Sequence, residues 1–250
     1  MISKTKIKFI KSLQLKKNRE QARLFIAEGH KVVEDLLATS RAHTLVTTQE
    51  WLSCHPTPPA DEVIEVSSDE LRKVSLLQHP QQVLGLFPFF ASDTHAINTS
   101  TLSLMLDGIQ DPGNLGTIIR IADWFGIHDI YCSRETADVY NPKVVQATMG
   151  SITRVRLHYG ALEPMLKQLP KDFPIYGTLL EGNDIYSEQL SAHGLIIMGN
   201  EGNGISAPIR QIVNRPLLIP NYPPDSPTAD SLNVAIATAI TCAEFRRRER

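Results

Sequence analysis

The chain has 250 residues, of which 42% are hydrophobic and 21% charged, and its formal net charge is −2 at pH 7. These values exclude global disorder, and the length suits a small module followed by a larger domain. No stretch approaches the roughly 20 consecutive apolar residues of a membrane-spanning helix, and the N-terminal lysines lack the apolar segment of a signal peptide.

The first part of the chain is expected to form a small α/β domain. Apolar residues recur at helical spacing over residues 19–37, which predicts a helix that is broken or bent near Gly29. Short apolar runs with the patterns of strands and helices follow. Strands are expected at 44–48, 63–66 and 83–89, and a helix is expected at 69–77. The polar stretch 91–100 has the composition of a linker, so we place a domain boundary within it.

Positive charge is concentrated at the N-terminus. Eight basic residues precede the second carboxylate of the chain, Glu28: Lys4, Lys6, Lys8, Lys11, Lys16, Lys17, Arg19 and Arg23. A second cluster closes the chain, with Arg246, Arg247, Arg248 and Arg250. Charge alone favours a solvated helix face or a frayed terminus over a surface that contacts nucleic acid, so an RNA-binding role needs independent support.

The second part of the chain reads as a parallel sheet flanked by helices. Expected strands lie at 102–106, 127–132, 155–158, 175–180, 195–198 and 217–219, and helical segments separate them. A final helix is expected to start at Ser231, with Asp230 or Ser231 as its cap.

The strand expected at 102–106 leads into a turn containing Gly108 and Gly113 and then into a helix, which carries Asn114 and is expected to have Arg120 in its opening turns. The start of such a helix points free backbone N–H groups outward and attracts anions, so Asn114 and Arg120 are candidates for holding a phosphate or a ribose. The alternative is a plain tight connection with Arg120 on the surface.

The strand expected at 195–198 leads into a second turn, with three glycines in six residues and one carboxylate, Glu201. Glycines let a ligand approach the backbone closely, which suits a nucleotide-like molecule. A dinucleotide-binding turn is the competing interpretation. It is disfavoured because the turn comes late in the chain and no acidic residue lies on the next strand.

The third candidate segment opens the last helix, where Ser231 and Asn233 either cap the helix or face a ligand. All three segments follow strands of one parallel sheet, and ligands bind in the crevice at the carboxyl ends of such strands. Cysteines and histidines offer no competing metal site, because neither group has metal-ligand spacing. Trp51 and Trp124 are expected to be packing residues.

These segments resemble the three motifs of the SpoU (TrmH-like) ribose methyltransferases of the SPOUT superfamily. Asn114, Gly116 and Arg120 match the first motif; Gly199, Glu201, Gly202 and Gly204 match the second; residues 231–234 match the third. Further similarity lies at residues 140–145 and 149–151, and, in the N-terminal part, at 11–13 and 25–29. The loop 221–229 departs from the family pattern, since it contains three prolines and no glycine, and Asp230 stands where glutamate is common.

The resemblance implies a trefoil-knotted parallel-sheet methyltransferase domain over residues 96–250, preceded by an α/β RNA-binding domain over residues 1–95 that resembles certain ribosomal proteins. It implies S-adenosylmethionine as cofactor, no metal, and a homodimer that methylates a ribose 2′-hydroxyl of RNA. A cytoplasmic location is expected separately, because the three cysteines are far apart and odd in number, which fits a reducing compartment. The implied cofactor-binding residues are Thr178, Gly199, Gly202, Ile219 and Leu232. The implied catalytic residues are Asn114, Arg120, Glu201, Ser231 and Asn233. The RNA-binding residues are then expected to be Lys4, Lys6, Lys8, Lys11, Arg19 and Arg23.

In this family the arginine matching Arg120 is treated as catalytic, in some accounts as the base. A guanidinium stays protonated in proteins, so we expect Arg120 to orient the ribose and neutralise the adjacent phosphate. The N-terminal domain favours ribosomal RNA over transfer RNA as the substrate. Two rival interpretations remain open: an RNA-binding protein without catalytic activity, and an enzyme dependent on a nicotinamide cofactor. Binding of S-adenosylhomocysteine distinguishes this proposal from both.

Overall fold

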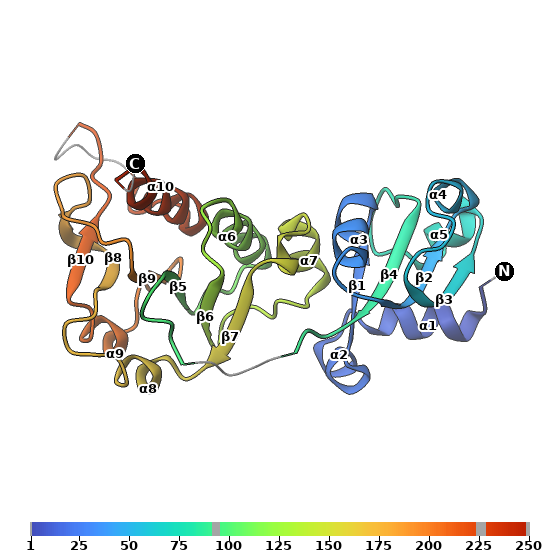
Figure 1. Ribbon diagram of the computed structural model, residues 1–250, viewed down its shortest axis with the longest axis horizontal. Helices are drawn as coiled ribbons and strands as arrows, with labels where there is room; N and C mark the ends of the chain where they lie inside the picture. Colours follow the sequence, from blue (N-terminus) through green and yellow to red (C-terminus); the bar gives the residue numbers. More distant parts are fainter. Residues whose placement is uncertain (1, 92–95, 224–228, 249–250) are drawn as a thin grey trace. The chain divides into compact units, whose positions relative to one another are not determined.

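The computed structural model describes residues 2–91, 96–223 and 229–248. It divides into two compact units, which Figure 1 shows. The first unit contains Met1–Ala91 and Asp138–Thr153, and the second contains Ser92–Ala137 and Arg154–Arg250. The segment Asp138–Thr153 therefore packs with the first unit, although both of its ends continue into the second.

The first unit is built on a four-stranded sheet of order β1-β4-β2-β3, in which only β2 and β3 are parallel. Its strands are β1 Leu24–Glu28, β2 Ala42–Thr47, β3 Ala60–Glu65 and β4 Val83–Pro88. Its helices are α1 Lys4–Ser12, α2 Lys16–Ala22, α3 His30–Leu37, α4 Gln49–Cys54, α5 Ser68–Val74 and α7 Pro142–Thr148, followed by the short 3-10 helix η1 Ser151–Thr153. Ser67 begins α5 with a capping box that includes Glu70.

The prediction of a helix over residues 19–37, broken or bent near Gly29, is confirmed in part: α2 and α3 are helices and Gly29 is the N-cap of α3, but the segment between them is not helical. The middle of this segment is the strand β1, which pairs with β4 along its whole length. All five residues of β1 are buried. A strand that is buried on both faces carries a continuous apolar run, and periodicity does not distinguish such a run from a helix.

Aromatic and glycine contacts hold the segment 138–153 on the first unit. The ring of Tyr140 stacks on Phe89 at a centroid distance of 3.9 Å, and its hydroxyl accepts a hydrogen bond from the backbone N–H of Phe90 at 2.9 Å. Gly150 has a φ of +94°, and a Cβ there would lie 2.0 Å from Oδ2 of Asp35. Only glycine fits this position, because the backbone conformation and the space both exclude a side chain.

The second unit confirms the predicted parallel sheet. It has six strands in the order β10-β8-β9-β5-β6-β7, and every neighbouring pair is parallel. The strands are β5 Leu102–Asp107, β6 Asp129–Ser133, β7 Arg156–Gly160, β8 Ile175–Asp184, β9 Gly194–Gly199 and β10 Arg215–Leu218. The helices are α6 Pro112–Trp124, α8 Leu162–Leu166, α9 Ala207–Arg210 and α10 Val234–Arg247.

Helices cover both faces of this sheet. In Figure 1, α6 and α10 lie together on one side, and α8 and α9 lie on the other, where they share a core with β5, β6 and β9. The helices α6 and α10 are joined at both ends. Asn233, before α10, bonds Asn114 in the first turn of α6, and Nε of Arg246 donates to the carbonyl of Phe125 at 2.7 Å. The two helices therefore run in the same direction.

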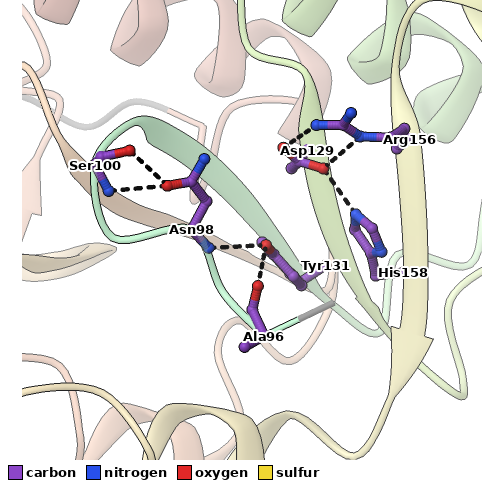
Figure 2. Close-up of polar contacts among 7 residues, drawn as sticks. All are labelled: Ala96, Asn98, Ser100, Asp129, Tyr131, Arg156 and His158. Atoms are coloured by element: carbon purple, nitrogen blue, oxygen red, sulfur yellow. Dashed lines mark hydrogen bonds and ion pairs between the residues drawn. The ribbon is translucent and has the colours of Figure 1, made fainter. Parts of the chain in front are cut away.

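A polar network centred on the buried Asp129 lies at the amino ends of β6 and β7, shown in Figure 2. The carboxylate of Asp129 accepts hydrogen bonds from Nε and Nη2 of Arg156 at 2.9 and 2.7 Å, and Nε2 of His158 lies 2.8 Å from its Oδ1. Burial opposes ionisation of Asp129, but the bonds from Arg156 and His158 outweigh it and lower its pKa. Beside them, the Tyr131 hydroxyl accepts from the N–H of Asn98 at 3.2 Å, which anchors the chain entering β5.

Two further predictions concern single residues. Trp51 is buried as expected, but Trp124 is 85% exposed at the end of α6, so its assignment as a packing residue is wrong. The predicted start of the last helix at Ser231 is also wrong. Asn233 is the N-cap, and its Oδ1 accepts from the N–H groups of Ala235 and Ile236. Among the described residues, no helix is both long and apolar enough to cross a membrane.

Candidate active site

The site lies where the direction of the chain through the sheet reverses. The first strand of the second unit, β5, has β6 on one side and β9 on the other. Such a switch point leaves a crevice at the carboxyl ends of the strands. Here the two turns that follow β5 and β9 are bonded to each other. Asn200 donates to the carbonyl of Gly108 at 2.7 Å, and Asp107 accepts from the N–H of Ser206 at 2.8 Å.

The turn after β9 depends on Gly199 and Asn200. A Cβ on Gly199 would lie 2.2 Å from the carbonyl carbon of Gly204, so no larger residue fits without moving the backbone. Oδ1 of Asn200 accepts from the N–H groups of Gly202 and Asn203 at 2.9 and 3.0 Å. Asn200 was not among the predicted site residues, although an asparagine within a glycine turn is a signal for this type of side-chain bond.

Three predicted catalytic residues form one ordered chain of hydrogen bonds. Nδ2 of Asn233 donates to Oδ1 of Asn114 at 3.0 Å, and Nδ2 of Asn114 donates to Oε1 of Glu201 at 2.9 Å. The direction is fixed at its start, because Oδ1 of Asn233 already accepts from two N–H groups of α10. Each amide must therefore donate toward Glu201. The chain brings all three sequence motifs together.

A cavity of about 430 Å³ opens beside these turns. All five predicted cofactor-binding residues line it: Thr178, Gly199, Gly202, Ile219 and Leu232. Of the predicted catalytic residues, Glu201 and Ser231 also line it. Apolar side chains from three segments, including Met198, Leu217 and Ile205, supply the rest of a mixed surface. The cavity thus combines apolar walls with exposed backbone and a few polar groups, which is typical of a small-molecule site.

Arg120 is placed differently from its expected position. It is the ninth residue of α6, so it lies in the third turn of that helix rather than in the opening turns. Its side chain is exposed, and no described residue forms a hydrogen bond or ion pair with it. Asn114 lies in the first turn of α6 instead, and its backbone N–H donates to Oδ1 of the N-cap Asp111 at 2.7 Å.

The candidate basic residues of the first unit differ in availability. Lys4, Lys8, Lys11 and Arg23 are exposed, whereas Lys6 is half-buried and forms an ion pair with Glu62. Arg19 is only 2% exposed, and its guanidinium donates to Asp138 at 2.6 Å and to the carbonyls of Leu13 and Gln14. Those bonds and its burial leave Arg19 unable to contact RNA in this structure, and they give it a structural role.

Neither metal nor thiol chemistry is supported near the cavity. The described residues contain no group of three or more histidine, cysteine and carboxylate side chains arranged to hold a metal ion. Burial raises the pKa of the Cys132 thiol, and it raises that of Cys242 to about 12, so both stay protonated at neutral pH.

A parallel sheet with a cavity at the carboxyl-terminal parts of β8, β9 and β10, a glycine turn in the cavity wall and a directed chain of amides is the arrangement of an α/β enzyme for a nucleotide-like ligand. Comparison with known proteins narrows this class. The SpoU rRNA Methylase family matches residues 101–243, and an MRM3-like substrate binding domain matches residues 4–85. The chain belongs to the SpoU rRNA methylase family.

Relatives match over nearly the full length of the chain. The chain is 29% identical to the 23S rRNA (guanosine(2553)-2'-O)-methyltransferase RlmP of Bacillus subtilis, over 96% of each protein. The structure of a TrmH-family protein from Porphyromonas gingivalis superimposes with a TM-score of 0.89 at 37% identity, covering 99% of each chain. An AdoMet-bound rRNA methyltransferase from Sinorhizobium meliloti gives 0.86 at 32% identity, over 99% of this chain and 97% of that one.

Proposed function

We propose that this protein transfers a methyl group from S-adenosylmethionine to a ribose 2′-hydroxyl of RNA. The observation that carries the proposal is the hydrogen-bonded chain from Asn233 through Asn114 to Glu201, which ends beside the cavity. Three sequence motifs that are far apart in the chain thereby supply one site. The names of the B. subtilis and S. meliloti relatives support this activity.

The cavity fits S-adenosylmethionine in both size and chemistry. Its volume of about 430 Å³ lies within the range of small-molecule sites. A Cβ on Gly204 would meet no atom within 4 Å, so the turn leaves space directly beside its backbone. Thr178, Gly199, Gly202, Ile219 and Leu232 would hold the cofactor, which supplies an electrophilic methyl group when bound.

The protein's own residues have to position the ribose and handle its proton. Glu201 and Ser231 line the cavity and are placed to bond the ribose hydroxyls, while Asn114 and Asn233 orient Glu201. The exposed guanidinium of Arg120 is available to hold the RNA phosphate next to that ribose, as a permanently charged group. Alignment of the two reactants is the main contribution expected of these contacts.

Ribosomal RNA is the proposed substrate, and the first unit is its proposed binding domain. Lys4, Lys8, Lys11 and Arg23 are exposed there and carry the positive charge that phosphates require, with Lys6 beside them. A division into residues 1–95 and 96–250 is supported by the family matches at residues 4–85 and 101–243, because the proposed boundary lies between them. The segment 138–153 nevertheless packs with the first unit.

The finer architecture is also part of the proposal. A trefoil knot in the second unit is supported by its likeness to TrmH-family structures. A homodimer is supported by large apolar side chains exposed on α6 and at the start of α10: Trp124, Leu232 and Ile236. A cytoplasmic location is supported by three free cysteines. The loop from Asn221 to Ala229 lies partly outside the described residues, as do Arg250 and part of the expected linker.

The test is methyl transfer from radiolabelled S-adenosylmethionine to ribosomal and transfer RNA, followed by mapping of 2′-O-methyl groups in RNA from cells with and without the protein. One ribosomal ribose should lose its methyl group without the protein and gain it in vitro. Methylation of transfer RNA alone would overturn the substrate, and cofactor binding without transfer to any RNA would overturn the activity.

A further inference from the structure

The charges around the cavity are unevenly distributed. Its lining includes the carboxylates of Glu181, Glu201 and Asp230 but, among the described residues, only one cationic side chain, Arg210. Arg210 ends α9, and Glu181 lies in the carboxyl-terminal half of β8. A ligand with a negatively charged group therefore has one cationic side chain in the cavity wall to bind.

Arg210 and Glu181 already contact each other. Nη2 of Arg210 forms an ion pair with Oε2 of Glu181, and the two side chains are 49% and 73% exposed. Ion pairs this exposed add little to folding stability, so the pair is poorly explained as a structural device. Within the described part of the chain, the remaining guanidinium N–H groups and Oε1 of Glu181 have no hydrogen-bond partner. Both side chains can accept a ligand group while they stay paired.

We propose that Arg210 and Glu181 bind the amino-acid end of the cofactor, which carries an α-carboxylate and an α-ammonium on one carbon. Arg210 takes the carboxylate, for which the planar guanidinium is suited, and Glu181 takes the ammonium. The opposite charges of the protein pair match the opposite charges of the ligand. The inference rests on the proposed function, because it needs S-adenosylmethionine in this cavity.

Three ligands separate the two contacts by isothermal titration calorimetry. S-adenosylhomocysteine carries both groups, decarboxylated S-adenosylmethionine carries only the ammonium, and 5′-methylthioadenosine carries neither. Arg210→Met keeps the unbranched stem of the side chain without the guanidinium charge, and Glu181→Gln removes the charge of its partner. Arg215→Met is the matched control, since Arg215 is an exposed arginine on β10 that does not line the cavity.

Arg210→Met should weaken the binding of S-adenosylhomocysteine about ten- to hundredfold, as expected for the loss of a hydrogen bond to a charged group. The affinities of the other two ligands should not change. Glu181→Gln should weaken the binding of the two ligands that carry the ammonium group but not the binding of 5′-methylthioadenosine. Arg215→Met should change none of the three. If Arg210→Met does not fold, Arg210→Lys replaces it, with a smaller loss confined to S-adenosylhomocysteine.

The proposal is overturned if Arg210→Met leaves S-adenosylhomocysteine binding intact, or if it weakens all three ligands equally, which would indicate a structural role. It is also overturned if the wild-type protein binds S-adenosylhomocysteine no more tightly than 5′-methylthioadenosine. A wild-type protein that binds none of the three would instead refute the cofactor assignment, so the two failures are distinct.

Discussion

Asn233 has two tasks that two substitutions can separate. Its Oδ1 caps α10 by accepting from the N–H groups of Ala235 and Ile236 at 3.0 and 3.3 Å, and its Nδ2 orients Asn114. Asn233→Ala removes both tasks. Loss of an N-cap costs about 1 kcal/mol, which lowers the Tm of a chain of this length by about 2–4 °C.

Asn233→Asp keeps the cap of α10 but no longer orients the amide of Asn114. A carboxylate caps a helix about as well as an amide, and the helix dipole favours its charge, so the Tm should stay within about 1 °C of the wild type. The new oxygen, however, would face Oδ1 of Asn114 across 3.0 Å with no proton between them. Asn114 must then turn its amide, and the bond of 2.9 Å to Glu201 is lost.

Loss of a hydrogen bond to a charged group costs about 1.5–3 kcal/mol, so turnover should fall about ten- to hundredfold in both variants. Thermal unfolding and single-turnover methyl transfer to RNA, run on the same preparations, measure the two effects separately. Wild-type turnover in Asn233→Asp would refute the orienting role. An equal loss of Tm in both variants would refute the capping assignment.

Five other substitutions, one of them a control, test four separate parts of the structure. Arg120→Lys should abolish turnover but spare S-adenosylhomocysteine binding, because an ammonium lacks the planar pair of donors; near-normal turnover would contradict the proposed clamp. Gly199→Ala would place Cβ 2.3 Å from the backbone nitrogen of Ile205, so this variant should lose cofactor binding in calorimetry. Gly202→Ala is the control, because its Cβ would have no contact below 3.6 Å and the variant should still fold. Asp129→Asn should lower the Tm at pH 7. The pKa of Asp129 in the folded protein is lowered from the ordinary aspartate value of 3.8. The carboxylate therefore stabilises the fold fully above pH 3.8, and this stabilisation is lost as the pH falls through the pKa of the folded state. The Tm values of the wild type and the variant should then converge in acid. Arg19→Met leaves Asp138 without its guanidinium and should cost about 3 kcal/mol in urea unfolding, and a loss below about 1 kcal/mol would show that the pair is not structural.

The sequence was most informative where backbone geometry restricts residue choice. Gly199 is required because the chain returns within 2.2 Å of where its Cβ would lie, and such a requirement leaves a glycine in the sequence that can be recognised. The order of apolar runs and helices likewise predicted the parallel sheet, because parallel neighbours need helical crossovers between them. Both signals are local or depend only on the order of elements.

Contacts between residues that are far apart in the chain could not be predicted from the sequence. The charge of Arg19 suggested RNA, but Asp138, far along the chain, buries that charge in an ion pair. Asn233 was one of two candidates for a ligand contact, and the fold shows that its amide serves both a helix and a neighbouring motif. The exposure of Trp124 also depends on the neighbours of α6 rather than on its own residues.

The directed amide chain explains why the three motifs have to act together. An amide alone is free to rotate by half a turn, which exchanges donor and acceptor. At Asn233 the N–H groups of α10 remove that freedom, and the order is then imposed on Asn114 and on the donor facing Glu201. Glu201 thus receives a fixed donor on Oε1. A ribose hydroxyl that approaches Glu201 therefore meets a carboxylate whose orientation is set by the start of a helix more than thirty residues later in the chain.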